Sequence, residues 1–263
     1  MEKQAIDFKE KPVAETLIIP LLARAKETKS GNPILSDPKA VEIASQISVD
    51  SKKFEGGEIS NFGILVRTEI IDCEIKRIVD NSIKSTVIIN LGVGLDTRVS
   101  RMDNERLIWF DLDLPEVINL RKKFFSEAED VSFIPRSVLD ESWMEEIAIG
   151  NDANVIFIAE GLLMYFPEPE VKEILGRISE KFKGAHMFFD VVHSYFVGKG
   201  ISCQFLWGLD KASDIEKMSE NIELIQSWST GNLHRERQSL MFRILNIFPS
   251  TRSRSQILHI RFK

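Results

Sequence analysis

The sequence predicts one doubly wound α/β domain, in which a mostly parallel sheet carries helices on both faces. Short, almost fully apolar runs recur along the chain, as is typical of parallel strands that are buried on both sides. Helical segments fall between most of these runs. The 263 residues are 43% hydrophobic and 28% charged, which is ordinary for a globular protein, so we expect a single domain over residues 1–263.

The N-terminal part of the chain is predicted to be helical. Residues 12–26 have a helical pattern, although Pro20 is expected to break or kink that helix. A second helix is expected to begin at Pro38, with Asp37 as its N-cap. Residues 54–61 contain two adjacent glycines and are expected to form a loop.

The central part of the chain alternates between helical and strand patterns. Apolar residues recur at helical spacing from Phe62 to Val79, which places Arg67, Thr68 and Asp72 on one helix. Apolar runs then predict five strands, at residues 86–91, 106–111, 131–134, 154–159 and 185–192. Helices are expected between them, chiefly at residues 114–128 and 168–183.

The C-terminal part is less regular. Residues 255–262 alternate in the manner of a strand, which we expect at an edge of the sheet, whereas residues 201–232 look helical. Residues 1–60 and 193–250 lie outside the predicted sheet. We expect the first segment to form a helical cover and the second to form a substrate cap.

Composition argues against several classes of partner. The formal charge of -6 is opposite to the basic surface of a nucleic-acid-binding protein. The N-terminus lacks the apolar region of a signal peptide, and no apolar run approaches the ~20 residues that span a bilayer. Cys73 and Cys203 are expected to be reduced thiols, and no metal-ligand spacing occurs. We therefore expect a cytoplasmic protein that binds neither nucleic acid nor membrane and needs no metal.

Candidate site residues follow the ends of the predicted strands, where ligands bind in doubly wound sheets. Gly92 and Gly94 follow the first strand and would allow a sharp turn close to a ligand, although such glycines are equally typical of a plain turn. Asp111 and Asp113 lie 19 and 21 residues beyond Gly92, so either could accept hydrogen bonds from a ribose. The other would be a solvated carboxylate.

Two further charged residues belong to the predicted site. Glu160 ends the fourth strand, and a carboxylate there needs solvent, a ligand hydroxyl or ammonium, or a local basic side chain. Arg67 has the planar fork that suits a carboxylate, but taken alone it is better explained by a surface ion pair. These residues predict a nucleotide-type site. Thr97 stands where a dinucleotide fingerprint prefers Gly or Ala, which disfavours NAD without excluding it.

Four segments together resemble the leucine carboxyl methyltransferase family, especially its bacterial polyketide-type O-methyltransferase branch. They are Arg67-Thr68 with Asp72, the Asn90-Leu-Gly-Val-Gly-Leu-Asp-Thr-Arg98 loop, Trp109-Phe-Asp-Leu-Asp-Leu-Pro-Glu116, and Ala159-Glu-Gly-Leu-Leu-Met-Tyr165. They span residues 60–170 in the order that the family has them.

The resemblance implies a class I S-adenosylmethionine fold, with a seven-stranded sheet and an antiparallel strand near its end. It also implies that Arg67 holds the cofactor carboxylate, Gly92 its methionine portion and Glu160 its amino end. For the ribose it favours Asp113, whereas the strand-end position alone favours Asp111.

One segment departs from the family pattern. The family places an acidic and a hydrophobic residue beside the adenine, after the third strand, where this chain has Ser137 and Val138. A hydroxyl does not replace the charge of a carboxylate, so these two residues are retained as weaker adenine contacts.

The sequence therefore predicts an S-adenosylmethionine-dependent O-methyltransferase that acts on a carboxylate or hydroxyl of a small, polyketide-like molecule. Tyr165, His193 and Tyr195 follow the fourth and fifth strands and are candidates for the acceptor pocket, with no base role assigned. Within the family, a protein C-terminal carboxyl methyltransferase is the alternative. From other classes, an NAD-linked oxidoreductase or a non-catalytic cofactor-binding module remains open.

Overall fold

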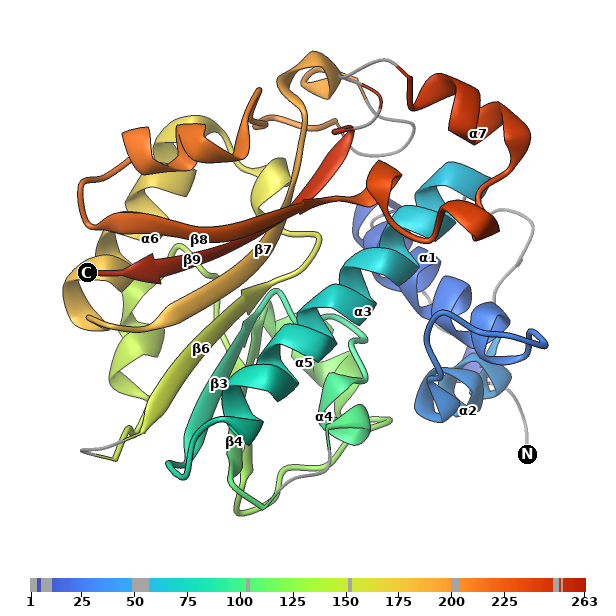
Figure 1. The fold of residues 1–263 in the computed structure, drawn as a ribbon. Helices are drawn as coiled ribbons and strands as arrows, with labels where there is room; N and C mark the ends of the chain where they lie inside the picture. Colours follow the sequence, from blue (N-terminus) through green and yellow to red (C-terminus); the bar gives the residue numbers. More distant parts are fainter. Residues whose placement is uncertain are drawn as a thin grey trace.

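The computed structural model describes residues 4–5, 11–48, 57–102, 105–150, 153–199, 204–247, 251 and 253–263. Within these ranges, a seven-stranded mixed sheet is flanked by helices (Figure 1). The predicted doubly wound α/β fold is confirmed. No helix in the described part of the chain is long and apolar enough to cross a membrane.

The sheet contains five parallel strands, a sixth strand that runs antiparallel to both of its neighbours, and a seventh at the edge. In spatial order the strands are β5 (Val131–Pro135), β4 (Leu107–Asp113), β3 (Thr86–Leu91), β6 (Asn154–Ala159), β7 (His186–Val192), β9 (Ser255–Phe262) and β8 (Ile222–Ser229). The five strands predicted from apolar runs are all present. A separate two-residue parallel pair joins β1 (Gln4–Ala5) to β2 (Ile47–Ser48).

Seven α-helices are described: α1 (Lys11–Thr28), α2 (Pro38–Gln46), α3 (Glu58–Asp80), α4 (Arg98–Arg101), α5 (Pro115–Arg121), α6 (Glu168–Lys181) and α7 (Leu240–Leu245). Short 3-10 helices connect several elements: η1 (Glu141–Glu145), η2 (Leu163–Tyr165), η3 (Ser194–Phe196), η4 (Ala212–Lys217), η5 (Thr230–Asn232) and η6 (Arg235–Arg237).

Two apolar layers fix the sheet between the helices. Ile71 and Ile75 of α3 pack with Ile88 of β3 on one face. Val171 and Ile174 of α6 lie in the layer on the other face. Because the central strands bury both faces, they read as continuous apolar runs in the sequence.

The N-terminal helices differ in part from the prediction. Helix α1 continues through Pro20, so the expected break is wrong, whereas the alternative, a kink, stays a prediction. The helix is held by packing of Ile18 and Leu21, which offsets the hydrogen bond that a proline cannot donate. Asp37 caps α2 as predicted, and accepts a hydrogen bond of 2.9 Å from the amide of Ala40.

Other boundaries also shift. Helix α3 begins at Glu58, so residues 58–61 are helical and not part of the predicted loop. Residues 54–56 lie outside the described part of the chain, as do residues 201–203 of the segment predicted to be helical.

The C-terminal strands correct two predictions. Residues 222–229 form β8, not a helix, and β8 is the strand at the edge of the sheet. Strand β9 lies between β7 and β8, so its predicted edge position is wrong. Its alternating pattern misled because the polar residues Gln256 and His259 are buried within the strand.

Candidate functional site

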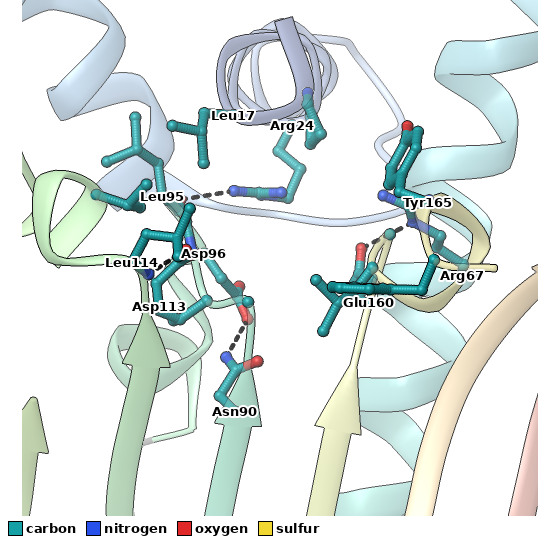
Figure 2. A pocket seen from close by; sticks show the side chains of 18 of the residues that line it. Leu17, Arg24, Arg67, Asn90, Leu95, Asp96, Asp113, Leu114, Glu160 and Tyr165 are labelled. Atoms are coloured by element: carbon teal, nitrogen blue, oxygen red, sulfur yellow. Dashed lines mark hydrogen bonds and ion pairs between the residues drawn. The ribbon is translucent and has the colours of Figure 1, made fainter. Parts of the chain in front are cut away.

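A cavity of about 570 Å³ lies at the carboxyl ends of β3, β4 and β6, in the size range of small-molecule sites. Helix α1 passes over it, and Leu17, Pro20 and Arg24 contribute to its lining (Figure 2). Helix α3 contributes Arg67, and the turn after β6 contributes Glu160. The cavity is therefore closed by the N-terminal helices on one side and by the sheet on the other.

The glycine loop after β3 is shaped by backbone that favours glycine. Gly92 has φ +63°, and a Cβ there would lie 2.6 Å from Cδ1 of Leu162. Gly94 has φ +52°, and a Cβ there would lie 2.5 Å from Cδ2 of Leu17 on α1. Both glycines line the cavity, so the loop brings backbone close to whatever occupies it.

Asp113 ends β4 at the floor of the cavity. Its carboxylate accepts hydrogen bonds from the amides of Gly94 and Leu114, each 2.8 Å long. Burial raises the pKa of Asp113 to about 6, although these two amides oppose the shift. The residue lines the cavity, and no ion pair in the described residues occupies its carboxylate.

Asp111 lies two residues deeper on the same strand and does not line the cavity. It is fully buried, and its Oδ2 accepts hydrogen bonds of 2.9 and 2.6 Å from Nε and Nη2 of Arg121. Burial raises the pKa of Asp111, and the adjacent Arg121 opposes this shift. Asp111 is therefore part of a buried ion pair, which separates its surroundings from those of Asp113.

Glu160 is surrounded by hydrogen-bond donors of the protein. Its Oε1 accepts from Nε of Arg67 at 3.0 Å and from the hydroxyl of Thr68 at 2.7 Å. Its Oε2 accepts from Nη2 of the fully buried Arg98 at 2.6 Å. Burial opposes ionisation, but Arg98 and Arg67 outweigh it and lower the pKa of Glu160 to about 2. A local basic side chain was one of the partners that the sequence allowed for Glu160, and the structure provides two, Arg67 and Arg98.

Arg67 is braced from two sides. Besides Glu160, its Nη1 donates a hydrogen bond of 2.7 Å to Oδ2 of Asp190, a buried residue near the end of β7. The other oxygen of Asp190 accepts from the amide of Gly161 at 2.6 Å. Burial opposes the charge of Arg67, but Asp190 and Glu160 outweigh it and raise the pKa of the guanidinium.

These contacts belong to one continuous network of ion pairs around the cavity. It joins four arginines (Arg24, Arg67, Arg98, Arg101) to five carboxylates (Asp37, Asp72, Asp96, Glu160, Asp190). Asp96 lines the cavity, and although burial opposes its ionisation, Arg98 and Arg101 lower its pKa. In their ionised forms, these side chains leave one negative charge in excess beside the cavity.

Arg24 is a lining residue that the sequence reasoning missed. It comes from α1, 71 residues before the glycine loop, where its Nη2 donates to the carbonyl of Leu95 at 3.0 Å. The signal that could have found it is helical spacing, because Leu17, Pro20 and Arg24 lie on one face of a helix.

The remaining predicted residues divide into two groups. Tyr165 lines the cavity (Figure 2). Its ring centroid lies 5.7 Å from that of Phe205. His193 and Tyr195 do not line it, and Tyr195 is 61% exposed.

The pair predicted beside the adenine is also outside the cavity lining. Val138 is buried in the core, and the hydroxyl of Ser137 accepts a hydrogen bond from the amide of Leu139. The structure therefore brings Arg67, Gly92, Gly94, Asp113, Glu160 and Tyr165 together around one cavity.

Comparison with known proteins gives concordant relatives. The tetracenomycin polyketide synthesis O-methyltransferase TcmP of Streptomyces glaucescens is 27% identical over 226 residues, which cover 82% of this chain and 83% of that protein. The S-adenosyl-L-methionine-dependent methyltransferase dpfgK of Gibberella zeae is 28% identical over 229 residues, which cover 77% of each protein.

A solved structure supports the fold. Magnesium protoporphyrin IX methyltransferase from Synechocystis PCC 6803, with bound S-adenosylmethionine, superposes with a TM-score of 0.50 at 10% sequence identity. The match covers 88% of this chain and all of that one. The model of the leucine carboxyl methyltransferase family matches residues 17–179, which confirms the resemblance found in the sequence. Because that match covers more than half of the chain and includes most of the cavity, the chain belongs to the leucine carboxyl methyltransferase family.

Proposed function

We propose that this chain transfers the methyl group of S-adenosylmethionine to an oxygen atom of a small molecule, a carboxylate or hydroxyl of a polyketide-like metabolite. The chain is a methyltransferase that uses S-adenosylmethionine, as its family and named relatives are. The observation that carries the proposal is one cavity lined by three carboxylates, two arginines and several apolar side chains. The bound cofactor supplies an electrophilic methyl group on a sulfonium.

The residues around the cavity fit the cofactor. Asp113 would accept hydrogen bonds from the ribose hydroxyls, because its oxygens have only backbone amides as partners in the described residues. Arg67 and Glu160 would face the carboxylate and the ammonium of the amino-acid end. The cofactor carries a net positive charge, which suits a cavity lined by three carboxylates and two arginines.

The glycine loop would let the cofactor lie against backbone. Gly92 and Gly94 both line the cavity with positive φ values, and Leu162 and Leu17 already occupy the positions that side chains there would need. A larger residue at either position would strain the loop and displace Leu162 or Leu17, which also line the cavity that the cofactor would enter.

The acceptor would bind against the apolar part of the cavity lining. Leu17, Pro20, Leu162, Tyr165 and Phe166 are among its apolar lining residues and would exclude water from the methyl group. Transfer is an in-line displacement, so the main task of these residues would be to align the oxygen nucleophile with the methyl carbon. A carboxylate is ionised at neutral pH and needs no base, whereas a hydroxyl benefits from one.

The experiment combines binding with turnover. Calorimetry should show that the purified chain binds S-adenosylhomocysteine and does not bind NAD. A labelled-methyl screen should then compare aromatic and polyketide carboxylic acids with their methyl esters, and with peptides that end in a free carboxylate. Transfer to peptides alone would favour the protein carboxyl methyltransferase instead, and binding of NAD without S-adenosylhomocysteine would overturn the proposal.

A further inference from the structure

Arg24 reaches the cavity in a fixed orientation. Its Nε donates to Oδ2 of Asp37 at 2.9 Å, and its Nη2 donates to the carbonyl of Leu95 at 3.0 Å. The Arg24 side chain is 4% exposed and that of Asp37 is fully buried. Among the described residues, Nη1 of Arg24 has no acceptor, although the side chain lines the cavity. One donor of a fixed cation is therefore available to a ligand.

Asp37 carries more contacts than an N-cap requires. Its Oδ1 accepts from the amide of Ala40, which is sufficient to cap α2. Its Oδ2 accepts from Arg24, from Nη1 of Arg101 at 2.9 Å and from the hydroxyl of Thr97. An uncharged Asn or Ser would serve as the cap, and burying a charge is costly. The carboxylate therefore has a purpose beyond starting a helix.

The position of Asp37 connects the helical cover to the glycine loop. Arg24 belongs to α1, Asp37 precedes α2, and Thr97 directly follows the segment that lines the cavity. Figure 2 shows Arg24 extending from α1 toward Leu95 across the cavity. A long, flexible side chain that is already held loses less rotamer freedom when it binds a ligand.

Arg24 and Arg67 each keep one terminal nitrogen, Nη1 and Nη2 respectively, without an acceptor among the described residues, so both could receive a ligand carboxylate. Nε and Nη1 of Arg67 are committed to Glu160 and Asp190, which brace it from both sides. Arg24 is close enough to act on the same region, because its charge contributes to the lowered pKa of Glu160 and Asp96. These carboxylates would draw the ammonium of an amino acid, and a neighbouring cation would receive its carboxylate.

We infer that Asp37 is a positioning residue, which holds Arg24 over the cavity so that the guanidinium receives the carboxylate of the cofactor's amino-acid end. The inference rests on the proposed function. It predicts that replacing Asp37 lowers the affinity for ligands that carry the amino-acid carboxylate and leaves the affinity for ligands without it unchanged.

The test uses two ligands and a matched control. Calorimetry measures binding of S-adenosylhomocysteine, which has the amino-acid end, and of 5′-methylthioadenosine, which lacks it. Asp37→Asn should lower the affinity for S-adenosylhomocysteine by about tenfold, which corresponds to the loss of one charge-assisted contact. The affinity for methylthioadenosine should change by less than about twofold. Asp140 caps η1 at the surface, so Asp140→Asn should change neither.

Further variants keep the test decisive. If Asp37→Asn folds poorly, Asp37→Ser is used instead, because serine also supplies an oxygen that caps α2. For each variant, the stoichiometry fitted to the calorimetric titration gives the fraction of folded molecules. Arg24→Gln should likewise weaken binding of S-adenosylhomocysteine and not of methylthioadenosine. Adding Asp37→Asn to Arg24→Gln should cause little further loss of affinity, because the two residues would act as one unit.

Three results would overturn the inference: unchanged S-adenosylhomocysteine binding in Asp37→Asn, an equal loss for both ligands, or a full additional loss in the Arg24→Gln background. Failure of the proposed function is a different result, because the unmodified chain would then bind neither ligand and the inference would fall with it.

Discussion

Replacement of Asp113 by Ala tests which of two aspartates on one strand holds the ribose. The carboxylate of Asp113 lines the cavity, and in the described residues its partners are two backbone amides, so its remaining lone pairs would be available to a ligand. A carboxylate that accepts two hydroxyl hydrogen bonds is worth about 2 to 4 kcal/mol, since the two bonds are not additive. Asp113→Ala should therefore lower the affinity for S-adenosylhomocysteine roughly 30- to 700-fold.

Asp111→Asn is the matched control. Asp111 forms a buried ion pair with Arg121, and both side chains are 1% exposed. Removing one charge from such a pair costs about 3 to 5 kcal/mol of folding free energy, because the partner stays buried and unpaired. The control should therefore lose stability. Its folded molecules should bind S-adenosylhomocysteine with less than about a tenfold change, because Arg121 still donates to the loop carbonyls of Gly94 and Asp96.

The assay is calorimetric titration of both variants at pH 7.5, alongside urea denaturation of each. Binding is compared per folded molecule, which separates a lost contact from a lost fold. The reasoning is refuted if Asp113→Ala binds as the unmodified chain does. It is refuted equally if Asp111→Asn, while folded, loses more affinity than Asp113→Ala.

The remaining predictions concern the glycine loop, pH and the ion-pair network. Gly92→Val should abolish cofactor binding, because its φ of +63° strains any other residue and its side chain meets Leu162; Gly150→Val, where a Cβ would meet no neighbour, should bind normally. Cofactor affinity should fall about tenfold per pH unit below pH 6, because the pKa of Asp113 is about 6 in the free chain and protonation removes its acceptor charge; a flat titration from pH 7 to pH 5 would contradict this. Glu160→Gln should lower the unfolding free energy by about 3 to 5 kcal/mol, since two buried arginines lose a shared charge; an unchanged urea midpoint would show that they find other partners.

Much of the fold was predictable because strands that are buried on both faces of the sheet consist of uninterrupted apolar residues. Strands β3 and β6 have no exposed residue, and uninterrupted apolar runs are the direct result. Strand β8 escaped prediction because it is the edge strand, with exposed Glu223 and Gln226 among its apolar residues. Nothing in its local pattern distinguishes such a strand from the face of a helix.

The site was predictable where its residues follow strand ends. Asp113 and Glu160 occupy such positions, and topology alone brings them to one edge of the sheet. Arg24 and Asp37 could not be placed in this way, because their contacts with the glycine loop span 60 residues or more. Such contacts depend on how α1 packs over the sheet, which local patterns do not encode.

The strand-end position alone favoured Asp111 for the ribose, and only the family resemblance favoured Asp113. Both side chains lie on the same side of β4 by the period of a strand. What distinguishes them is Arg121, ten residues after Asp111, which reaches back from α5 and pairs with the deeper carboxylate. A partner on the next helix therefore decides which aspartate remains available.

The place of β9 inside the sheet affects the order in which this fold can assemble. Strand β8 is joined to the rest of the sheet through β9, although β9 comes later along the chain. During synthesis, β7 and β8 both emerge before β9, the strand that pairs with each of them. Until β9 has been made, the edges of β7 and β8 that it will occupy stay unpaired. Unpaired edges invite association with other chains. Shortening the chain before Ser255 would make that temporary state permanent, and we expect aggregation of such a product during expression.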